Sequence, residues 1–333
     1  MMMTGACSDS GAGPAARRLQ VRLQRIDYAA EAINILDLAA TDAGGLPPFE
    51  AGAHIDLHLP PDMVRQYSLC GDPADGSRYR IAVLRQDDGR GGSRSVHALR
   101  CGDMLEISAP RNGFPLDMRA GHHLLVAGGI GITPMIPMLH VLERQGADYS
   151  LYYCARGAGK MAFRDEIDRL ARRGTAHLFF DGAAFRVVLA DLLQPGAQPA
   201  GTHLYHCGPA ALMAAVAQRT AVWPPGTVHA EFFAAPAGDR PAEGAAADGF
   251  EVVLARSGTR IAVPPGVSIA DALRQAGIAT ATSCEQGICG ECVVGYSAGE
   301  PDHRDFILSD GERRTQVALC CARSHSPSLT IDL

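Results

Sequence analysis

Three closely spaced cysteines near the end of the chain have the residue type and spacing to bind iron. Cys284, Cys289 and Cys292 follow the pattern C-x4-C-x2-C. Plant-type [2Fe–2S] clusters use this spacing together with a fourth cysteine that is distant in the sequence. Cys320 and Cys321 are the two candidates for the fourth ligand. They are adjacent, so spacing alone does not choose between them.

A structural zinc site is the alternative for these cysteines. Such sites usually pair their cysteines in two short C-x2–4-C steps, whereas here three are clustered and the fourth is distant. Gly287 and Gly290 also suit a loop that turns backbone N–H groups toward anionic sulfur. The pattern therefore favours the iron–sulfur cluster. Cys320 ends a strand-like segment, 317–320, on which adjacent side chains point oppositely, so only one of the two candidates is expected to face the cluster.

Two motifs in the first third of the chain together suit a flavin. Arg65 opens the sequence RQYSL, and a Gly91-Gly92-Ser93 turn precedes a predicted helix. An arginine and the N–H groups of a helix N-terminus can bind the phosphate. Tyr67 can cover the ring or ribityl carbons, and the serine after it can hydrogen-bond the ring edge. Taken alone, RQYSL is better explained by a strand with an exposed arginine, and it is the pairing with the later glycine turn, just before a nucleotide-binding sheet, that favours the flavin.

A glycine-rich turn follows the most apolar strand-like segment. Gly129-x-Gly131-x-x-Pro134 lies between that strand and a predicted helix, which is the context of a pyrophosphate-binding turn. The third glycine of the usual dinucleotide fingerprint is absent. Pro134 suits the first turn of the helix, and Thr133 is expected to cap it.

Further candidates follow later strands of the same predicted sheet. Cys207-Gly208-Pro209 forms a second turn that allows close approach, although a plain strand-to-helix turn explains it as well. Arg156 and Asp181 each follow a strand, at the edge where open α/β sheets bind ligands. An acid at this edge disfavours the extra phosphate of NADPH, so the sequence favours NADH, whereas Arg156 is the residue that argues for NADPH.

The elements that must position these residues fall into three regions. Short alternating strands with Gly, Pro and Asp turns between residues 20 and 117 predict an antiparallel barrel. From residue 122 to 220 strands alternate with helices, at 133 onward, 163–173 and 211–219, which predicts a parallel, doubly wound sheet. After residue 249, a hairpin with an RSGT turn precedes a short helix that Ser268 caps and Gly277 ends.

Composition limits the functional classes. The formal charge of −6 gives no reason to expect nucleic acid as a partner. The segment 1–16 is small and polar, so we expect a disordered tail and a cytoplasmic protein without a signal peptide. Glycines and prolines interrupt the apolar run 124–142, so no membrane association is expected. Without a secretory signal, the ten cysteines indicate metal or redox use rather than disulfides.

These motifs resemble a known family. SCEQGICGEC, GEPDHRDFILSD and LCCARS in the segment 283–333 resemble the C-terminal domain of the phthalate dioxygenase reductase and vanillate O-demethylase reductase family. The resemblance implies that Cys320 is the fourth ligand. RQYSL with the later GGS turn resembles the flavin barrel of the ferredoxin reductase superfamily, in its FMN-binding branch, which favours FMN over FAD.

The resemblance also implies the fold and its boundaries. We expect a multidomain chain with an FMN-binding antiparallel β-barrel (17–118), a doubly wound α/β NADH-binding domain (119–233) and a linker (234–248). An α+β β-grasp ferredoxin domain with the [2Fe–2S] cluster is expected at 249–333. The expected cofactor-binding residues are Arg65, Gln66, Tyr67, Ser68, Val83, Leu84, Arg85, Gly91, Gly92, Ser93, Ser95, Gly129, Gly131, Ile132, Thr133, Pro134, Arg156, Asp181, Cys207, Gly208, Pro209 and Phe233. Ser68, Cys207, Glu231 and Phe233 are expected beside the flavin and nicotinamide, and Cys284, Cys289, Cys292 and Cys320 at the metal.

The implied function is electron transfer. The ferredoxin domain stands last, as in reductases of two-component Rieske oxygenases, so we expect a monomeric reductase that passes electrons from NADH through FMN and the cluster to a separate Rieske-type oxygenase. No protein side chain need be an acid or base, because the cofactors supply the chemistry. The alternatives are a reductase for a cytochrome P450 or another acceptor, an NADH oxidase, and a redox-sensing protein with the same cofactors.

Overall fold

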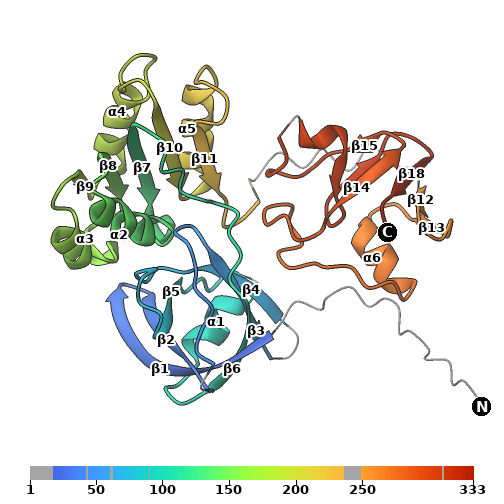
Figure 1. The fold of residues 1–333 in the computed structure, drawn as a ribbon, viewed down its shortest axis with the longest axis horizontal. Helices are drawn as coiled ribbons and strands as arrows, with labels where there is room; N and C mark the ends of the chain where they lie inside the picture. Colours follow the sequence, from blue (N-terminus) through green and yellow to red (C-terminus); the bar gives the residue numbers. More distant parts are fainter. Residues whose placement is uncertain (1–17, 43, 61–62, 90, 236–248, 310) are drawn as a thin grey trace, which may run out of the picture.

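The computed structural model describes residues 18–42, 44–60, 63–89, 91–235, 249–309 and 311–333. The expected tail and residues 236–248 of the expected linker lie outside the described residues. Figure 1 shows three regions: a barrel, an α/β domain and a C-terminal domain. None of the helices in the described ranges has the length and apolar character that crossing a bilayer requires.

The first region is a six-stranded antiparallel barrel with strand order β4-β3-β6-β1-β2-β5. Its strands are β1 (Arg18–Ala30), β2 (Ile33–Ala40), β3 (His54–Leu59), β4 (Met63–Ser68), β5 (Arg78–Leu84) and β6 (Met104–Ser108). A bridge between Leu69 and Ile81 joins the two outer strands and closes the barrel. The short helix α1 (Gly92–His97) contributes Val96 to the barrel core.

The second region is a parallel sheet with strand order β11-β10-β7-β8-β9. Its strands are β7 (His122–Gly128), β8 (Tyr149–Cys154), β9 (Thr175–Phe179), β10 (Thr202–Cys207) and β11 (Val228–Glu231). The helices are η1 (Gly129–Ile132), α2 (Met135–Gln145), η2 (Ala158–Lys160), α3 (Arg164–Leu170), α4 (Gly182–Leu192) and α5 (Ala210–Thr220). The sequence analysis did not predict α4.

Alternation along the central strand explains why this sheet is covered on both faces. Leu125 and Ala127 of β7 belong to the core that includes α2 and α3. Leu124 and Val126 belong to the core that includes α4 and α5. Successive strand side chains point to opposite faces, so a continuous apolar run places one core on each side. This is the doubly wound arrangement that the sequence predicted.

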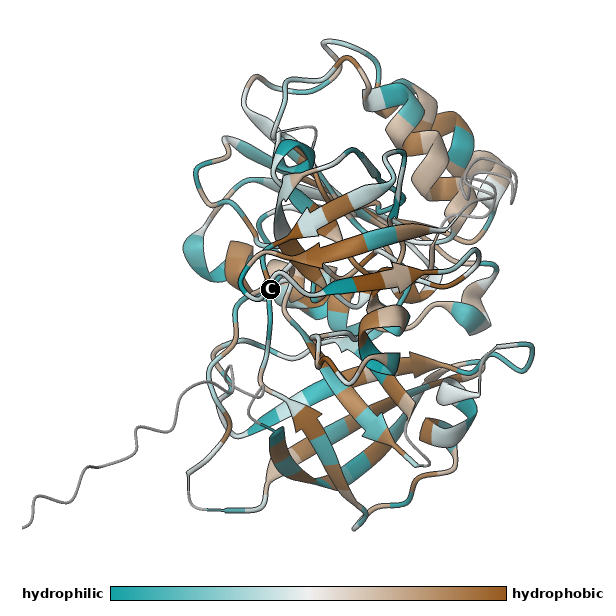
Figure 2. Ribbon diagram, turned by 90° about the vertical axis from the view of Figure 1, so that its right-hand side faces the viewer, coloured by the Kyte–Doolittle hydropathy of each residue, from teal (hydrophilic) through white to brown (hydrophobic). Residues whose placement is uncertain are grey.

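The third region is a mixed five-stranded sheet with strand order β13-β12-β18-β14-β16 and a short pair, β15 with β17. Its elements are β12 (Phe250–Leu254), β13 (Arg260–Val263), α6 (Ile269–Gln275), β14 (Val293–Ala298), β15 (Pro301–Asp302), η3 (Glu312–Arg314), β16 (Gln316–Ala318), β17 (Arg323–Ser324) and β18 (Ser328–Ile331). Ser268 caps α6 by accepting from the Asp271 N–H at 3.0 Å, as predicted. Figure 2 shows hydrophobic residues along the strands of this sheet.

Two local predictions were wrong. The strand β16 ends at Ala318, so Cys320 lies in a turn, and side-chain alternation along a strand cannot choose between it and Cys321. Thr133 does not cap α2, because its hydroxyl donates to the Ile130 carbonyl at 3.0 Å. The 3-10 turn η1 lies between β7 and α2. The Thr133 hydroxyl hydrogen-bonds within that turn, so it does not cap the helix that follows.

Candidate functional site

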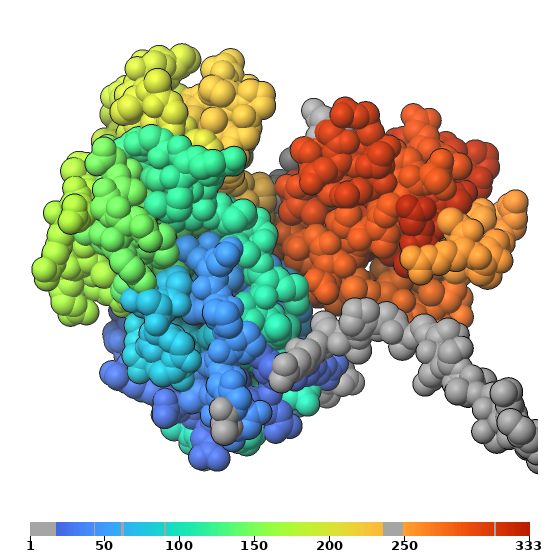
Figure 3. All heavy atoms as spheres, in the orientation of Figure 1, coloured from blue at the N-terminus to red at the C-terminus, as the bar shows by residue number. Residues whose placement is uncertain are grey.

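A cavity of about 630 Å³ lies where the three regions meet. Figure 3 shows the C-terminal domain, in orange and red, packed beside the barrel. The predicted site residues that line the cavity are Arg65, Gln66, Tyr67, Ser68, Val83, Leu84, Gly92, Ser93, Thr133, Glu231, Phe233, Cys284 and Cys289. Its volume is in the range of small-molecule and cofactor sites. Residues from all three regions thus share one cavity.

One end of the cavity has the donors expected for a phosphate. A Cβ on Gly92 would lie 2.6 Å from both Cγ and Nε of Arg65, so the glycine lets the arginine lie against the start of α1. Gly91 has the positive φ of 85° at this helix start, a conformation that glycine adopts at little cost. Ser93 accepts from the Gln86 N–H at 3.0 Å, which holds the turn. A fixed guanidinium beside helix N–H groups fits a phosphate monoester.

The other end joins the barrel to the α/β sheet. The Ser68 hydroxyl donates to the Glu231 carboxylate, with distances of 3.2 and 3.3 Å to its two oxygens. Burial raises the pKa of Glu231 to about 8, although the hydrogen bond from Ser68 opposes this. In the parallel register of β10 and β11, Cys207 lies opposite Glu231. Burial also raises the pKa of the Cys207 thiol. This end therefore favours neutral groups.

Tyr67 lies between these two ends on β4, and its hydroxyl is held neutral. Burial raises the pKa of Tyr67 to about 12, while the nearby Arg65 charge opposes that rise. Its ring is among the part-buried side chains packed on the barrel core. A neutral aromatic side chain lining the cavity fits an apolar ring system.

The two predicted nucleotide turns pack against each other. A Cβ on Gly131 would lie 2.4 Å from the Cys207 carbonyl oxygen and 2.7 Å from the Gly208 nitrogen. A Cβ on Gly208 would lie 3.1 Å from the Gly128 backbone. Real side chains do not tolerate such approaches, so these glycines let the ends of β7 and β10 come together. The turns form one surface at the carboxyl edge of the sheet, where open α/β sheets bind ligands.

Several predicted residues lie outside the cavity. Asp181 caps α4 by accepting from the Ala183 N–H at 2.8 Å, and Arg156 follows β8 at the same sheet edge. Arg85 forms an exposed ion pair with Asp87 at 2.8 Å. The others that do not line the cavity are Gly91, Ser95, Gly129, Gly131, Ile132, Pro134, Cys207, Gly208, Pro209, Cys292 and Cys320.

The four predicted ligands converge in the C-terminal domain. The Cys284 thiol contacts those of Cys289 and Cys320, and Cys320 also contacts Cys292. These thiol contacts, with backbone N–H groups, hold the pKa of Cys284 well below its ordinary value. The Cys320 N–H donates to the Cys292 sulfur at 3.4 Å, and the Cys284 sulfur accepts from the Gln286 N–H at the same distance. N–H donors directed at sulfur fit an anionic cluster.

The Cys321 thiol contacts that of Cys320, but its remaining contacts differ from those of its neighbour. It donates weakly to the Ala318 carbonyl at 3.7 Å, and it lies 2.7 Å from the position of a Cβ on Gly287. Within the described ranges, no group of three or more His, Cys, Asp or Glu side chains has the geometry to hold a single metal ion. A [2Fe–2S] cluster does not need that arrangement, because its four protein ligands are shared between two irons.

Sequence reasoning missed several residues of the cavity and its rim. His54 and Gln286 line the cavity, and burial, with the Arg111 charge, lowers the pKa of His54 to about 4. Asp56 and Arg111 connect the barrel to the C-terminal domain. Gln286 lies within the SCEQGICGEC motif without being a ligand, and His54, Asp56 and Arg111 belong to none of the motifs above. Their contacts join positions that are far apart in the sequence, which leaves no local signal.

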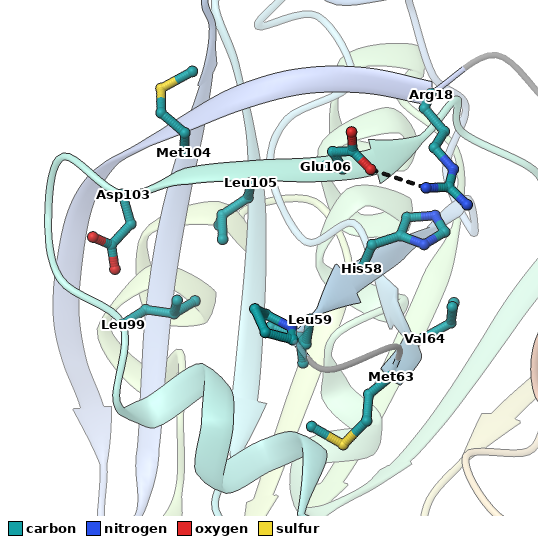
Figure 4. A pocket seen from close by; sticks show the side chains of 11 residues that line it. Arg18, His58, Leu59, Met63, Val64, Leu99, Asp103, Met104, Leu105 and Glu106 are labelled. Carbon is teal, nitrogen blue, oxygen red and sulfur yellow. Dashed lines mark hydrogen bonds and ion pairs between the residues drawn. The ribbon is translucent and has the colours of Figure 1, made fainter.

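A second cavity lies on the barrel and has a different character. It has a volume of about 700 Å³ and contains none of the predicted site residues. Figure 4 shows the ion pair of Arg18 with Glu106 at its rim, next to His58 and above Leu59. The pair is largely exposed, so it contributes little binding energy.

Comparisons with known proteins agree with this geometry. Residues 125–218 match the family described as oxidoreductase NAD-binding domain, and residues 252–324 match the 2Fe-2S iron-sulfur cluster binding domain. The chain is 43% identical over 330 residues to the reductase subunit of tert-butanol monooxygenase / tert-amyl alcohol desaturase of Aquincola tertiaricarbonis, with 95% of this chain and 96% of that protein covered. It is 40% identical over 318 residues to phthalate dioxygenase reductase of Burkholderia cepacia, covering 95% and 97%.

Two solved structures are similar over nearly the whole chain. A phthalate dioxygenase reductase structure, 39% identical, superposes with a TM-score of 0.66 and covers 95% of this chain and 98% of that one. An intact type IV self-sufficient cytochrome P450 monooxygenase, 37% identical, superposes with a TM-score of 0.84 over 95% of this chain. This chain corresponds to 41% of that longer protein.

Proposed function

Because this chain belongs to the phthalate dioxygenase reductase and vanillate O-demethylase reductase family, we propose that it is the reductase component of a two-component Rieske-type oxygenase. It is an NADH-dependent oxidoreductase with an NAD-binding and a 2Fe-2S domain. Electrons pass from NADH through FMN and the [2Fe–2S] cluster to an oxygenase. The Rieske-type nature of that oxygenase is the new element of the proposal.

One observation carries the proposal: a single cavity touches the barrel, the end of the α/β sheet and the cysteine loop. The cavity would hold FMN, which would supply the conversion between the two-electron chemistry of NADH and the one-electron chemistry of the cluster. The chain supplies positioning and exclusion of water. No residue has to move a proton to a substrate, and none of the described contacts requires one.

Each part of the cavity has a proposed role. Arg65 and the turn before α1 bind the FMN phosphate, and the barrel backbone around Val83 holds the ring edge. The turns at Gly131 and Gly208 receive the nicotinamide nucleotide, with Phe233 covering the nicotinamide position. The cysteines at 284, 289, 292 and 320 bind the cluster. The contacts between thiols and N–H donors support Cys320 as the fourth ligand.

Stopped-flow absorbance tests the electron path. Reconstituted protein mixed with NADH should show loss of flavin absorbance, followed by reduction of the cluster. A purified Rieske-type oxygenase, added last, should reoxidise the cluster. Flavin reduction without cluster reduction would contradict the path, and a protein that never turns over an acceptor would instead be a redox sensor.

A heme acceptor is the second candidate. The whole-chain superposition with the self-sufficient P450 is higher, at 0.84, than that with phthalate dioxygenase reductase, at 0.66, although the identities are nearly equal. The same pre-reduced protein should therefore be mixed separately with a Rieske oxygenase and with a P450. Faster electron transfer to the heme would favour this candidate over the Rieske assignment.

Nucleotide preference depends on Asp181 in this proposal. The Asp181 carboxylate repels the extra phosphate of NADPH in this proposal, and it also caps α4. Asp181→Asn keeps a cap of similar strength and removes the charge. The variant should lower KM for NADPH several-fold and change KM for NADH little.

A further inference from the structure

Four side chains outside the predicted site join the barrel to the cysteine loop. The Ser283 hydroxyl donates to Asp56 Oδ1 at 2.7 Å, and Arg111 Nη2 donates to Asp56 Oδ2 at 2.8 Å. Arg111 Nε lies 3.0 Å from Glu291 Oε2. Ser283, Asp56, Arg111 and Glu291 thus form one continuous chain of contacts, here called the interdomain clamp.

The barrel side of the clamp is held firmly. Asp56 lies on β3, and its side chain is only 9% exposed. A buried carboxylate is costly unless donors satisfy it, and here Ser283 and Arg111 each satisfy one oxygen. The Arg111 backbone exchanges two hydrogen bonds with His54, at 2.8 and 3.0 Å. The guanidinium therefore extends from a fixed backbone.

The other side of the clamp ends beside the proposed ligands. Ser283 directly precedes Cys284, and Glu291 directly precedes Cys292. Cys284 and Cys289 line the cavity proposed to bind the flavin, here called the flavin cavity. The segment 284–290, between the two clamp contacts, therefore faces that cavity. A shift of either contact would move cysteines relative to the cavity.

Further contacts among the described residues reach the C-terminal domain from another side. From the end of the α/β domain, the Ala235 N–H donates to Gln286 Oε1 at 3.3 Å, and Phe232 lies beside Phe306 with ring centroids 5.9 Å apart. The two solved relatives of nearly equal identity also differ in how well they superpose over the whole chain, with TM-scores of 0.66 and 0.84.

We propose that the interdomain clamp positions the cysteine loop over the flavin cavity, with Arg111 as its central residue. The inference rests on the proposed path from flavin to cluster. Arg111 touches neither cofactor site directly and acts through Asp56 and Glu291. Its bidentate reach matters, because a guanidinium can bind two carboxylates in fixed directions and an ammonium cannot.

Stopped-flow kinetics with NADH separate the two electron-transfer steps. Arg111→Gln should leave the flavin phase at the wild-type rate and slow the cluster phase about tenfold, which corresponds to ~1.4 kcal/mol. Arg111→Lys should recover part of the cluster-phase rate. Arg18→Gln is the matched control, because Arg18 pairs with Glu106 at 3.0 Å within the barrel and both side chains are largely exposed. It should change neither phase.

Hydrogen exchange provides a measurement that does not depend on activity. In the oxidised protein, amides between residues 284 and 292 should exchange faster in Arg111→Gln than in wild type, and at the wild-type rate in Arg18→Gln. Iron content and the EPR signal of the reduced cluster should stay unchanged, because no ligand is altered. Glu291→Gln should give the same effects, and the double variant should be no worse than either single one.

The outcomes distinguish the clamp from the electron path itself. Wild-type exchange and a wild-type cluster phase in Arg111→Gln would overturn the clamp. Equal slowing of both phases would also overturn it, since that indicates general destabilisation. If Arg111→Gln fails to fold, Asp56→Asn tests the same contacts by the same two measurements. If wild-type protein never reduces its cluster, the proposed function fails, whereas the exchange comparison still decides whether the clamp holds the loop.

Discussion

The barrel meets its two neighbours in different ways. Toward the α/β domain it shares one apolar core, in which Ala82 and Phe114 of the barrel side pack with residues such as Leu125 and Ile136. Phe114 also meets the ring of Tyr205 edge-on, with centroids 5.7 Å apart. Toward the C-terminal domain the described contacts are mostly polar, through the interdomain clamp. The C-terminal domain keeps an apolar core of its own.

This difference suggests that the two boundaries have different mechanical roles. Apolar burial is non-directional and adds up over a large area, so the barrel and the α/β domain should behave as one body that encloses the flavin and nucleotide. Hydrogen bonds and ion pairs depend on a few atoms and on direction. The C-terminal domain should therefore fold around its own core and be oriented by a few removable contacts.

Removal of the fourth ligand tests this difference most strongly. Cys320→Ser should abolish or destabilise the cluster, because its thiol contacts both Cys284 and Cys292. The transfer from NADH to FMN should persist, because the barrel and the α/β domain share a separate core. Iron content and EPR of the reduced protein measure the cluster, and NADH-dependent flavin bleaching measures the transfer from NADH to FMN.

The adjacent cysteine is the matched control for that change. Cys321→Ser should retain the EPR signal, since the Cys321 thiol contacts the Ala318 carbonyl. Iron loss in Cys321→Ser with retention in Cys320→Ser would reverse the choice of ligand. Loss of flavin bleaching in Cys320→Ser would show that the cluster and the transfer from NADH to FMN are not separable.

Two leucine truncations compare the cores directly. Leu139 lies fully buried in the core shared by the barrel and the α/β domain, and Leu273 lies fully buried in the C-terminal core. Each change to alanine should cost about 2–5 kcal/mol. Leu139→Ala should lower the temperature of flavin release and leave the loss of cluster absorbance in place, and Leu273→Ala should do the reverse. A shift of both signals in both variants would mean that the whole chain unfolds as one unit.

Local chemistry was readable from the sequence, and contacts between distant segments were not. The C-x4-C-x2-C spacing, the Ser268 cap and the continuous apolar run of β7 depend on neighbouring residues, so they could be predicted. The turn at Cys320 was missed, because the segment before it has strand propensity and β16 stops two residues earlier. The interdomain clamp was missed because Asp56 and Ser283 are 227 positions apart. An aspartate and a serine carry no signal of such a contact.

The proposed phosphate contact provides the next test, within the barrel alone. Arg65→Ala should weaken FMN retention by about 1.5–3 kcal/mol, the usual contribution of a hydrogen bond to a charged group. Arg85→Ala is its matched control, because the Arg85 side chain pairs with Asp87 at the surface and does not line the cavity. Equilibrium dialysis or flavin fluorescence measures retention. Equal loss in both variants would contradict the role of Arg65.

The last predicted effect lies at the boundary that the barrel shares with the α/β domain, and it is small for each single pH unit. Burial raises the pKa of Glu231 to about 8 from the ordinary 4.5, and burial keeps the Cys207 thiol opposite it neutral. Between these two pH values the folded protein holds a proton that the unfolded chain has released. Stability must therefore fall as pH rises through this window and level off above the folded-state pKa.

Glu231→Gln removes this titration and keeps a group that can accept from Ser68. The free energy of unfolding of wild type, relative to the variant, should fall by about 1 kcal/mol per pH unit across neutral pH. Urea unfolding at several pH values measures this difference, and Glu106→Gln on the exposed barrel surface is the control. Parallel curves for wild type and Glu231→Gln would mean that the carboxylate is ionised in the folded protein. In that case the boundary behind Ser68 would hold a charged carboxylate, as the interdomain clamp does, and the contrast between the two sides of the barrel would not hold there.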